Sequence, residues 1–185
     1  MRYLLLLLLA PNLVAADVGI DLLATTGGFG FESGFGIQFD GDGQYGMFGW
    51  DLQASWTNEQ KIGGDSGHRQ HVQGTARFYM DPVFLEAGVD HGRYSTKFAD
   101  GRTWEKAGTS PLIGVGAYFG GMEVTLRYAF PDNTVNRLHG LYFGMEVPWQ
   151  SFTFGLVARI AEFEQSGSTQ NDAAVMLELG WRLSR

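Results

Sequence analysis

The sequence has no cysteine among its 185 residues. Disulfide bonds and thiol chemistry therefore play no part in its fold or function. Basic residues are also scarce, with 13 Lys and Arg against 20 Asp and Glu, and they form no evident basic face. Binding to nucleic acid requires such a face, so nucleic acid is not an expected partner. Beyond residue 16, no apolar run approaches the about 20 residues that a membrane-spanning helix needs.

An unbroken apolar run lies at the N-terminus, where residues 4–10 are leucines followed by an alanine. Arg2 precedes this run, and the small residues Val14, Ala15 and Ala16 follow it. A positive start, a short apolar stretch and a small-residue cleavage site together make a secretory signal peptide. We therefore predict a cleaved signal peptide over residues 1–16 and a single mature domain over residues 17–185.

The mature sequence is rich in glycine and aromatic residues, and its apolar residues recur at every second position. This period is the signature of a β-strand with one apolar face. The alternate positions carry Gly, Thr and polar or charged residues, and no charge lies on the apolar face. Ten segments follow the pattern: 18–24, 29–39, 48–56, 72–80, 83–89, 113–119, 122–130, 141–147, 152–160 and 175–183.

Short and long connections alternate between these segments. Asp81-Pro82 and Gly120-Gly121 are tight turns, and residues 40–44 and 148–151 are slightly longer turns. The long polar connections are residues 57–70, 93–110, 131–137 and 163–172. This alternation is typical of outer-membrane barrels, which have short periplasmic turns and longer extracellular loops. We predict an all-β, antiparallel, transmembrane up-and-down β-barrel of about ten strands, or of eight if the first segment merges with the second.

The period alone leaves two choices for the apolar face. If it points inward, the protein is a soluble lipocalin-like carrier with an apolar cavity. Three features favour an outward apolar face: long apolar strands, aromatic residues near the strand ends, and a polar face that is rich in Gly and Thr. We therefore expect the apolar face to contact lipid and the polar face to line a narrow lumen.

Charged residues on the polar face predict ion pairs inside the barrel. Arg77 falls directly opposite Glu86 across the Asp81-Pro82 turn, and arginine is suited to fixed pairing with carboxylates. Because a charge in a narrow lumen must be paired or hydrated, we expect a network that fills it. Acids outnumber bases there, so any open path would prefer cations. The predicted network comprises Arg77, Glu86, Glu123, Arg127, Glu146, Arg159, Glu178 and Arg182.

With this pattern, the chain resembles the small outer-membrane barrels of Gram-negative bacteria of the OmpX, OmpA and opacity-protein type. The resemblance covers residues 17–185. A second resemblance, to the YfaZ family, rests on the step Arg127-Tyr128-Ala129-Phe130-Pro131-Asp132. These resemblances imply an outer-membrane location, contact with outer-membrane lipid and lipopolysaccharide, and assembly by the barrel-insertion machinery.

Catalytic constellations are weak in this sequence. His71 and Asp90 are similar to the rim Asp/His pair of omptin-like proteases, but Asp90 and His91 point to opposite faces and no second Asp pair is evident. No Ser-His-acid triad is found. His68, His71 and Asp65 lack further ligands set by spacing, so no metal site is predicted. We expect neither an enzyme nor a cofactor, and keep an omptin-like hydrolase as an alternative.

The connection at residues 93–110 is the best candidate for an external contact. Asp100-Gly101 at its centre is a hairpin-turn signal, so the flanking strands should protrude as a hairpin. The expected function is a structural or surface-interaction barrel whose loops bind an extracellular ligand or lipopolysaccharide, with a small cation-preferring pore as the alternative. The candidate contact residues are Arg93, Tyr94, Lys97, Phe98, Arg102, Trp104 and Lys106.

Overall fold

The structure is a computed structural model that describes residues 17–27, 33–60, 64, 66–131, 137–165 and 168–182. The predicted signal peptide, residues 1–16, lies outside them. The strands are β1 (Asp17–Gly27), β2 (Ser33–Tyr45), β3 (Phe48–Gln60), β4 (Ser66–Met80), β5 (Val83–Lys97), β6 (Thr103–Phe119), β7 (Met122–Ala129), β8 (Arg137–Trp149), β9 (Phe152–Gln165) and β10 (Ser168–Arg182).

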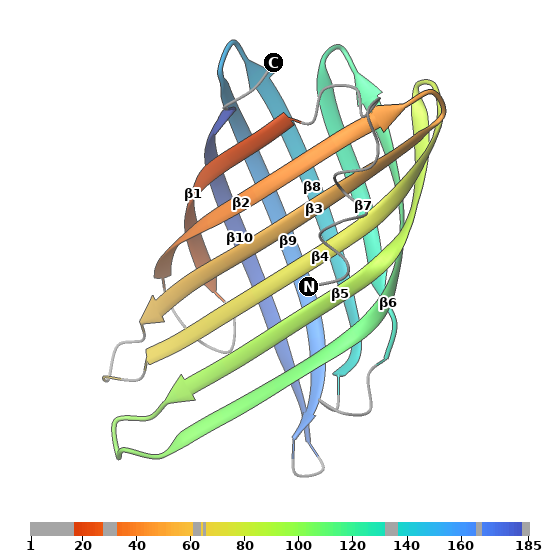
Figure 1. Ribbon diagram of the computed structural model, residues 1–185. Helices are drawn as coiled ribbons and strands as arrows, with labels where there is room; N and C mark the ends of the chain where they lie inside the picture. Colours follow the sequence, from red (N-terminus) through yellow and green to blue (C-terminus); the bar gives the residue numbers. More distant parts are fainter. Residues whose placement is uncertain are drawn as a thin grey trace, which may run out of the picture.

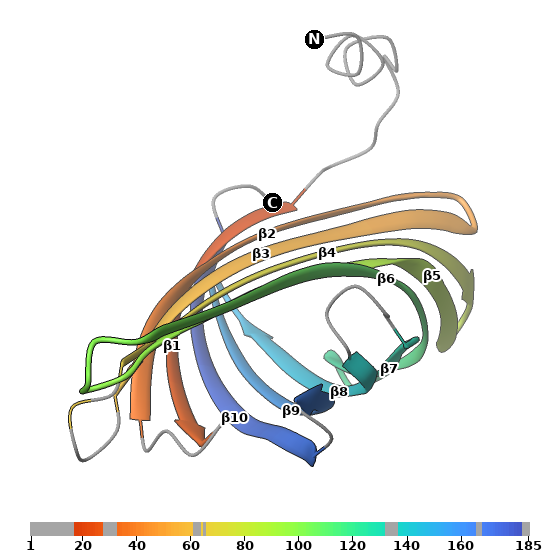
Figure 2. The same cartoon turned by 90° about the horizontal axis from the view of Figure 1, so that it is seen from below.

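These strands form one closed antiparallel barrel in which neighbours in sequence are neighbours in space (Figure 1). The sheet closes where β1 pairs with β10, from Gly19↔Arg182 to Gly27↔Ala174. Figure 2 shows the strands curving around a central space. The prediction of ten antiparallel strands is confirmed. The eight-stranded alternative is wrong, because β1 is a separate strand with partners on both sides.

The connections after the even-numbered strands are two-residue turns: Gly46-Met47, Asp81-Pro82, Gly120-Gly121 and Gln150-Ser151. They lie together at the upper end of Figure 1, which we call the short-turn end. Gly120 and Gly121 have φ of 60° and 88°, as a tight hairpin turn requires. The predicted turns at 40–44 and 148–151 were placed too early and too wide, because the β2–β3 and β8–β9 ladders continue to the last residue before each turn.

The opposite end, which we call the hairpin end, has shorter loops than predicted. The connections expected at 57–70, 93–110 and 163–172 are largely strand, because the ladders continue to Gln60↔Ser66, Lys97↔Thr103 and Gln165↔Ser168. Past the membrane-facing segments, polar residues occupy both faces of these strands. The period of two is then lost from the sequence although the hydrogen-bonded ladder continues.

The apolar face points outward along the whole wall. Exposed side chains there include Leu22, Phe35, Leu52, Val89 and Leu177. The polar face points inward and is buried, with Asp51, Gln73 and Arg127 among its members. The soluble lipocalin-like alternative is therefore wrong, because the apolar face of the strands is exposed on the outside of the barrel and the polar face lines its interior. Among the described residues, the structure has no helix long and apolar enough to cross a membrane.

The lumen also holds apolar side chains that the period did not predict. Leu23, Phe84 and Leu112 occupy inward positions and are almost fully buried. The Phe84 ring centroid lies 4.7 Å from the Arg77 guanidinium carbon and 5.4 Å from the Tyr118 ring. These apolar side chains fill space beside the charged groups of the lumen.

Most strands are longer than a membrane crossing requires. β4 and β5 have 15 residues and β6 has 17, whereas a tilted membrane strand needs about 9–11. β7 has only 8. We call residues 56–60, 66–70, 93–97 and 103–107 the β3–β6 extension, since the register aligns Trp56, Gln70, Arg93 and Ala107 in one row. In Figure 1 its β5–β6 hairpin runs out at the lower left, past the end of β7.

Candidate functional site

Two arginines meet inside the lumen, Arg77 from β4 and Arg127 from β7. Arg77 Nη2 lies 2.5 Å from Asp51 Oδ2, and its Nε lies 2.8 Å from Glu86 Oε1. Arg127 contacts the same carboxylates, at 2.9 Å to Asp51 Oδ2 and 2.7 Å to Glu86 Oε2. Glu123 lies 2.9 Å from Arg77 Nη2. All five side chains except that of Glu123 are at most 8% exposed. We call this group the central ion cluster.

The register explains how the central ion cluster forms. Arg77 and Glu86 are direct cross-strand partners, as predicted from the turn. The same row continues to Gly114 on β6 and to Arg127 on β7. Because Gly114 has no side chain, Arg127 reaches across β6 to Glu86. A Cβ on Gly114 would lie 2.8 Å from Glu86 Oε2 and 3.0 Å from Arg127 Cγ. Arg127 thus pairs with Glu86 and Asp51, while Glu146 and Glu178 of the predicted network line the same cavity as Arg127.

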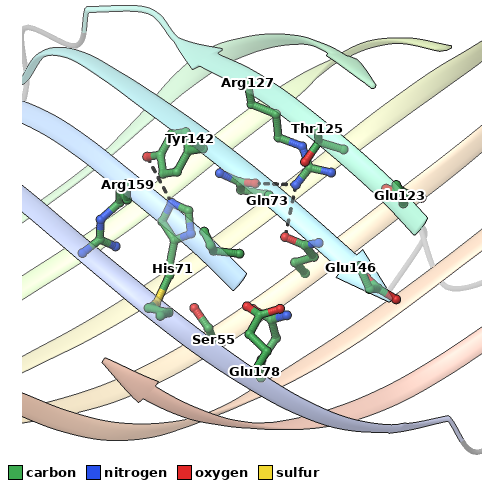
Figure 3. Close-up of a pocket in the computed structure, with 15 residues that line it drawn as sticks. Ser55, His71, Gln73, Glu123, Thr125, Arg127, Tyr142, Glu146, Arg159 and Glu178 are labelled. Carbon is green, nitrogen blue, oxygen red and sulfur yellow. Dashed lines mark hydrogen bonds between the residues drawn. The ribbon is translucent and has the colours of Figure 1, made fainter. Parts of the chain in front are cut away.

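A small polar cavity lies beside the central ion cluster (Figure 3). Arg127 Nη1 donates to Gln53 Oε1 at 3.2 Å and to Gln73 Oε1 at 3.0 Å on its wall. Arg159 from β9 and Glu178 from β10 also line it. Its volume of about 50 Å³ holds a few water molecules, since one water needs about 10–15 Å³ on this measure.

The lumen widens toward the short-turn end. Arg182 forms ion pairs there with Asp40 and with Glu146. These side chains, with Asp42 and Glu123, line a vestibule of about 190 Å³. Glu146 thus pairs with Arg182. Carboxylates outnumber arginines on the vestibule wall, which makes this mouth electronegative.

A second polar group lies in the lumen toward the hairpin end. Asp90 is fully buried, and its Oδ1 lies 2.5 Å from His71 Nε2. Tyr142 donates to Asp90 Oδ2 at 3.0 Å, and Gln73 donates to Oδ1 at 3.2 Å. His91 lies on the outer face, where its Nδ1 is 2.8 Å from Thr109 Oγ1. His71 lies next to Asp90, as expected. Together with Tyr142 and Gln73 it encloses the Asp90 carboxylate.

This enclosure limits the chemistry of the pair. A general acid or base must come within hydrogen-bond reach of its substrate, and Asp90 has no exposed surface. Farther toward the hairpin end, Arg69 Nη2 and Glu59 Oε2 pair at 2.8 Å, both nearly buried. Within the described ranges, no three His, Asp and Glu side chains are arranged to hold a metal ion. Sequence reasoning missed Glu59 and Arg69 because it placed both in a loop.

The outside of the β3–β6 extension carries a polar groove. Arg93 and Glu105 pair there, with Nη2 2.5 Å from Oε1. Trp56, at the membrane side, forms one wall, and His68 lies opposite Asn58 and contacts its side chain. The groove has a volume of about 280 Å³, and its lining is Trp56, His68, Gln70, Arg93, Ser95 and Glu105.

The structure separates the seven candidate contact residues into three groups. Arg93 and Lys97 lie on the exposed outer face. Trp104 and Lys106 occupy inward positions and are half-buried. Tyr94 is only 3% exposed, so its prediction as a surface contact is wrong. It occupies an inward position, and its ring packs over Gly92, where a Cβ would lie 2.8 Å from Tyr94 Cε2.

Phe98 and Arg102 belong to the hairpin tip. The Phe98 amide donates to the Arg102 carbonyl at 2.9 Å, and Gly101 has a φ of 86°. Asp100 accepts a hydrogen bond from the Arg102 amide and another from its guanidinium, and these bonds hold the pKa of Asp100 below its usual range. The Arg102 guanidinium carbon lies 5.5 Å from the Phe98 ring centroid. The tip is a locally bonded turn that ends the paired strands.

No protein-family model matches the chain, and no characterised protein matches its sequence. Among solved structures it is similar to Neisserial surface protein A (NspA), at 13% identity and a TM-score of 0.43, over 90% of this chain and 94% of that chain. It is also similar to Ail, the attachment invasion locus protein of Yersinia pestis, at 13% identity and a TM-score of 0.42, over 91% of this chain and 97% of that chain. The ten-stranded antiparallel wall, apolar exterior and ion-paired lumen described above are those of a small outer-membrane β-barrel protein.

Proposed function

We propose that the barrel anchors the protein in the outer membrane and that its function is a structural or surface-interaction role of the hairpin end. The main support is a contrast between two parts of the molecule. Ion pairs occupy the lumen, whereas the paired strands of the β3–β6 extension continue past the end of β7. A filled lumen leaves the outer surfaces to make contacts.

Orientation follows from the connections. Outer-membrane barrels keep their short turns in the periplasm, so the β3–β6 extension faces the cell exterior. Export by the predicted signal peptide over residues 1–16 and assembly by the barrel-insertion machinery belong to the same proposal. N-terminal sequencing of the mature protein, with Asp17 expected first, tests the export step.

Lipopolysaccharide is the proposed neighbour of the outer groove. Trp56 suits the boundary between hydrocarbon and headgroups. Arg93 lies in the same row as Trp56, His68 lies two residues farther out and Lys97 four residues farther out. These side chains offer donors and positive charge to phosphate. The groove supports contact with lipid headgroups on the outer leaflet, and the hairpin tip beyond it is free for an extracellular ligand.

The alternative is a small cation-preferring pore, which is favoured by the acidic vestibule at the short-turn end. A pore needs a continuous path, and the central ion cluster occupies the lumen between the vestibule and Asp90. Five charged side chains from four strands contact each other there. This packing supports a closed barrel. An omptin-like hydrolase is not supported, since Asp90 has no exposed surface.

Conductance in a planar lipid bilayer distinguishes the two functions. We expect the wild-type protein to carry no steady current, and the variant Arg77→Ala/Arg127→Ala, which opens the cluster and leaves its carboxylates, to carry a cation-selective current. Arg102→Ala at the hairpin tip is the matched control and should stay closed. The boiling-dependent shift of the folded band on SDS gels verifies each preparation. A steady cation current through the wild type would establish the pore and reject the closed barrel.

A further inference from the structure

β6 runs beyond its neighbour on one side. The last pair that it shares with β7 is Leu112↔Ala129, so residues 103–111 lie past the β6–β7 ladder. On the other side, β5 accompanies β6 to Lys97↔Thr103 with no register shift. β7 ends before Pro131, which has no N–H to offer a ladder. In Figure 1 this part of β6 forms the lower outline of the sheet.

Backbone directions identify which groups face the open side. Successive residues of an antiparallel strand direct their N–H and C=O groups to opposite neighbours. The Pro111 carbonyl accepts from the Phe130 amide at 3.0 Å, toward β7, whereas the Tyr118 amide donates to the Pro82 carbonyl at 2.8 Å, toward β5. The odd-numbered residues of β6 therefore face away from β5. The open side carries the N–H and C=O groups of Thr103, Glu105, Ala107 and Thr109, which form no ladder with the described residues.

A regular edge of this kind is a template for another strand. Proteins usually protect such edges with a bulge, a very short strand, a cover, a proline or charged side chains. Here the register is unbroken, and the proline lies at the base of the edge, at Pro111. An extended segment added along residues 103–109 would make main-chain hydrogen bonds with them, and the alternate side chains would set specificity.

Charge on the hairpin indicates the partner. Arg93 and Arg102 are paired with Glu105 and Asp100. Within the part of the chain that the structure describes, Lys97 and Lys106 form no ion pair. Lys106 lies on β6 itself, so a residue of an added strand would stand directly opposite it. Uncompensated positive charge beside an open edge favours an acidic segment.

We propose that residues 103–109 of β6 bind an extended acidic peptide segment by β-strand addition. This proposal rests on the proposed surface role and names the partner class of the hairpin end. The added strand pairs with the odd-numbered residues of the edge. Its acidic side chains lie beside Lys106 and are also attracted by the positive charge of Lys97.

The test uses a fluorescein-labelled synthetic peptide of alternating threonine and glutamate and the mature protein folded in detergent micelles. Fluorescence anisotropy measures binding. The matched probe is the same peptide with alternate amides N-methylated, which keeps the charge but cannot complete the ladder. We expect the unmodified peptide to bind at least 10-fold more tightly than the methylated one, and Lys106→Glu to weaken its binding at least 10-fold.

Ala107→Pro is the decisive variant. It removes an edge-facing N–H and places a ring where the added strand would lie, while the even-numbered residues keep their bonds to β5. Pro111 already occupies an edge-facing position of the same strand. We expect Ala107→Pro to weaken binding at least 10-fold and Ala107→Ser to stay within twofold of wild type. Hydrogen exchange should slow on binding at the amides of Glu105, Ala107 and Thr109, and not at those of Lys106 and Gly108, which β5 already protects.

Three results would overturn the proposal: no binding of the acidic peptide by the wild type, equal binding of the methylated peptide, or binding unchanged by Ala107→Pro. If the wild type instead forms a dimer that Ala107→Pro disrupts, the edge accepts a second copy and the acidic peptide is wrong. If the wild-type protein conducts ions, the proposed surface function is rejected. If it does not conduct and does not bind the peptide, only the strand addition is rejected.

Discussion

Arg77 is the residue on which the lumen depends most. Its guanidinium contacts Asp51 on β3, Glu86 on β5 and Glu123 on β7, so one side chain links four strands. Its flat face lies over Phe84, which joins the charged and aromatic parts of the lumen. Breaking a buried ion pair from one side leaves an uncompensated charge, which costs more than the pair contributes.

Replacing Arg77 by alanine should therefore destabilise the barrel strongly. Arg77→Ala leaves Asp51 and Glu86 with Arg127 alone and removes the partner of Glu123. A cost of about 3–5 kcal/mol is typical for such a loss. The free energy of unfolding in urea, measured in detergent or lipid vesicles, checks this. Arg102→Ala removes an exposed ion pair and should change stability by less than about 1 kcal/mol. An unchanged unfolding midpoint for Arg77→Ala would show that the lumen charges are not structural.

The period of two predicts which charged residues of the strands point inward, but it predicts a partner only where a tight turn fixes the register. The two-residue turn Asp81-Pro82 fixes Arg77 opposite Glu86, because residues at equal distances before and after such a turn are cross-strand partners. Arg127 reaches Glu86 only because Gly114 leaves the intervening position empty. The row from Arg77 to Arg127 depends on the registers of the β4–β5, β5–β6 and β6–β7 ladders. The long connection between β5 and β6 leaves the register of that pair undetermined by the sequence. Asp51 lies on the same polar face of β3 but is absent from the predicted network for the same reason.

At the scale of the element, the β5–β6 hairpin is an appendage of the barrel. Among the described residues, its strand ladders beyond Leu112 are within the hairpin and with β4. Its tip is closed by local bonds between Phe98 and Arg102.

Trimming this hairpin should separate the scaffold from the surface function. We propose replacing residues 95–105 by Asn-Gly, which joins the cross-strand partners Tyr94 and Lys106 through a two-residue turn. The trimmed protein should keep its heat-modifiable band and an unfolding midpoint close to wild type, while peptide binding falls at least 10-fold. If the trimmed chain fails to fold, the hairpin belongs to the scaffold. Peptide binding that survives trimming would place the site elsewhere.

The hairpin could be predicted, whereas the other extended strands could not. Asp100-Gly101 is a local turn signal, and the paired strands on either side reach it as expected. The extension of β3 and β4 into residues 57–60 and 66–70 has no such signal. Polar residues occupy both faces of these segments, including the buried Glu59 and Arg69, so no apolar period marks them. Only the hydrogen bonds with β5 and with each other define these segments.

At the scale of the whole molecule, the barrel inverts the arrangement of a soluble protein: lipid takes the place of the core, and ion pairs fill the interior. No water in the hydrocarbon layer can satisfy a broken ladder, so each backbone group of the wall must be bonded within the sheet. The β1–β10 ladder is what closes that sheet. The open edge of β6 is tolerable only where water replaces lipid, on the far side of the last β6–β7 pair.

Proline substitutions of two outward-facing alanines, Ala24 and Ala107, test whether the membrane wall and the β6 edge differ in this way. Ala24 pairs with Leu177 on one side and Phe35 on the other, so Ala24→Pro removes a ladder bond inside the membrane layer, at a cost of several kcal/mol. Ala107 has β5 on one side and the open edge on the other, and its N–H faces the edge. Ala24→Pro should abolish the band that shifts on boiling in SDS gels of outer-membrane fractions, and Ala107→Pro should retain it. Equal loss in both would mean that residues 103–109 are bonded within the wall, and equal survival would mean that the β1–β10 seam does not hold the barrel closed.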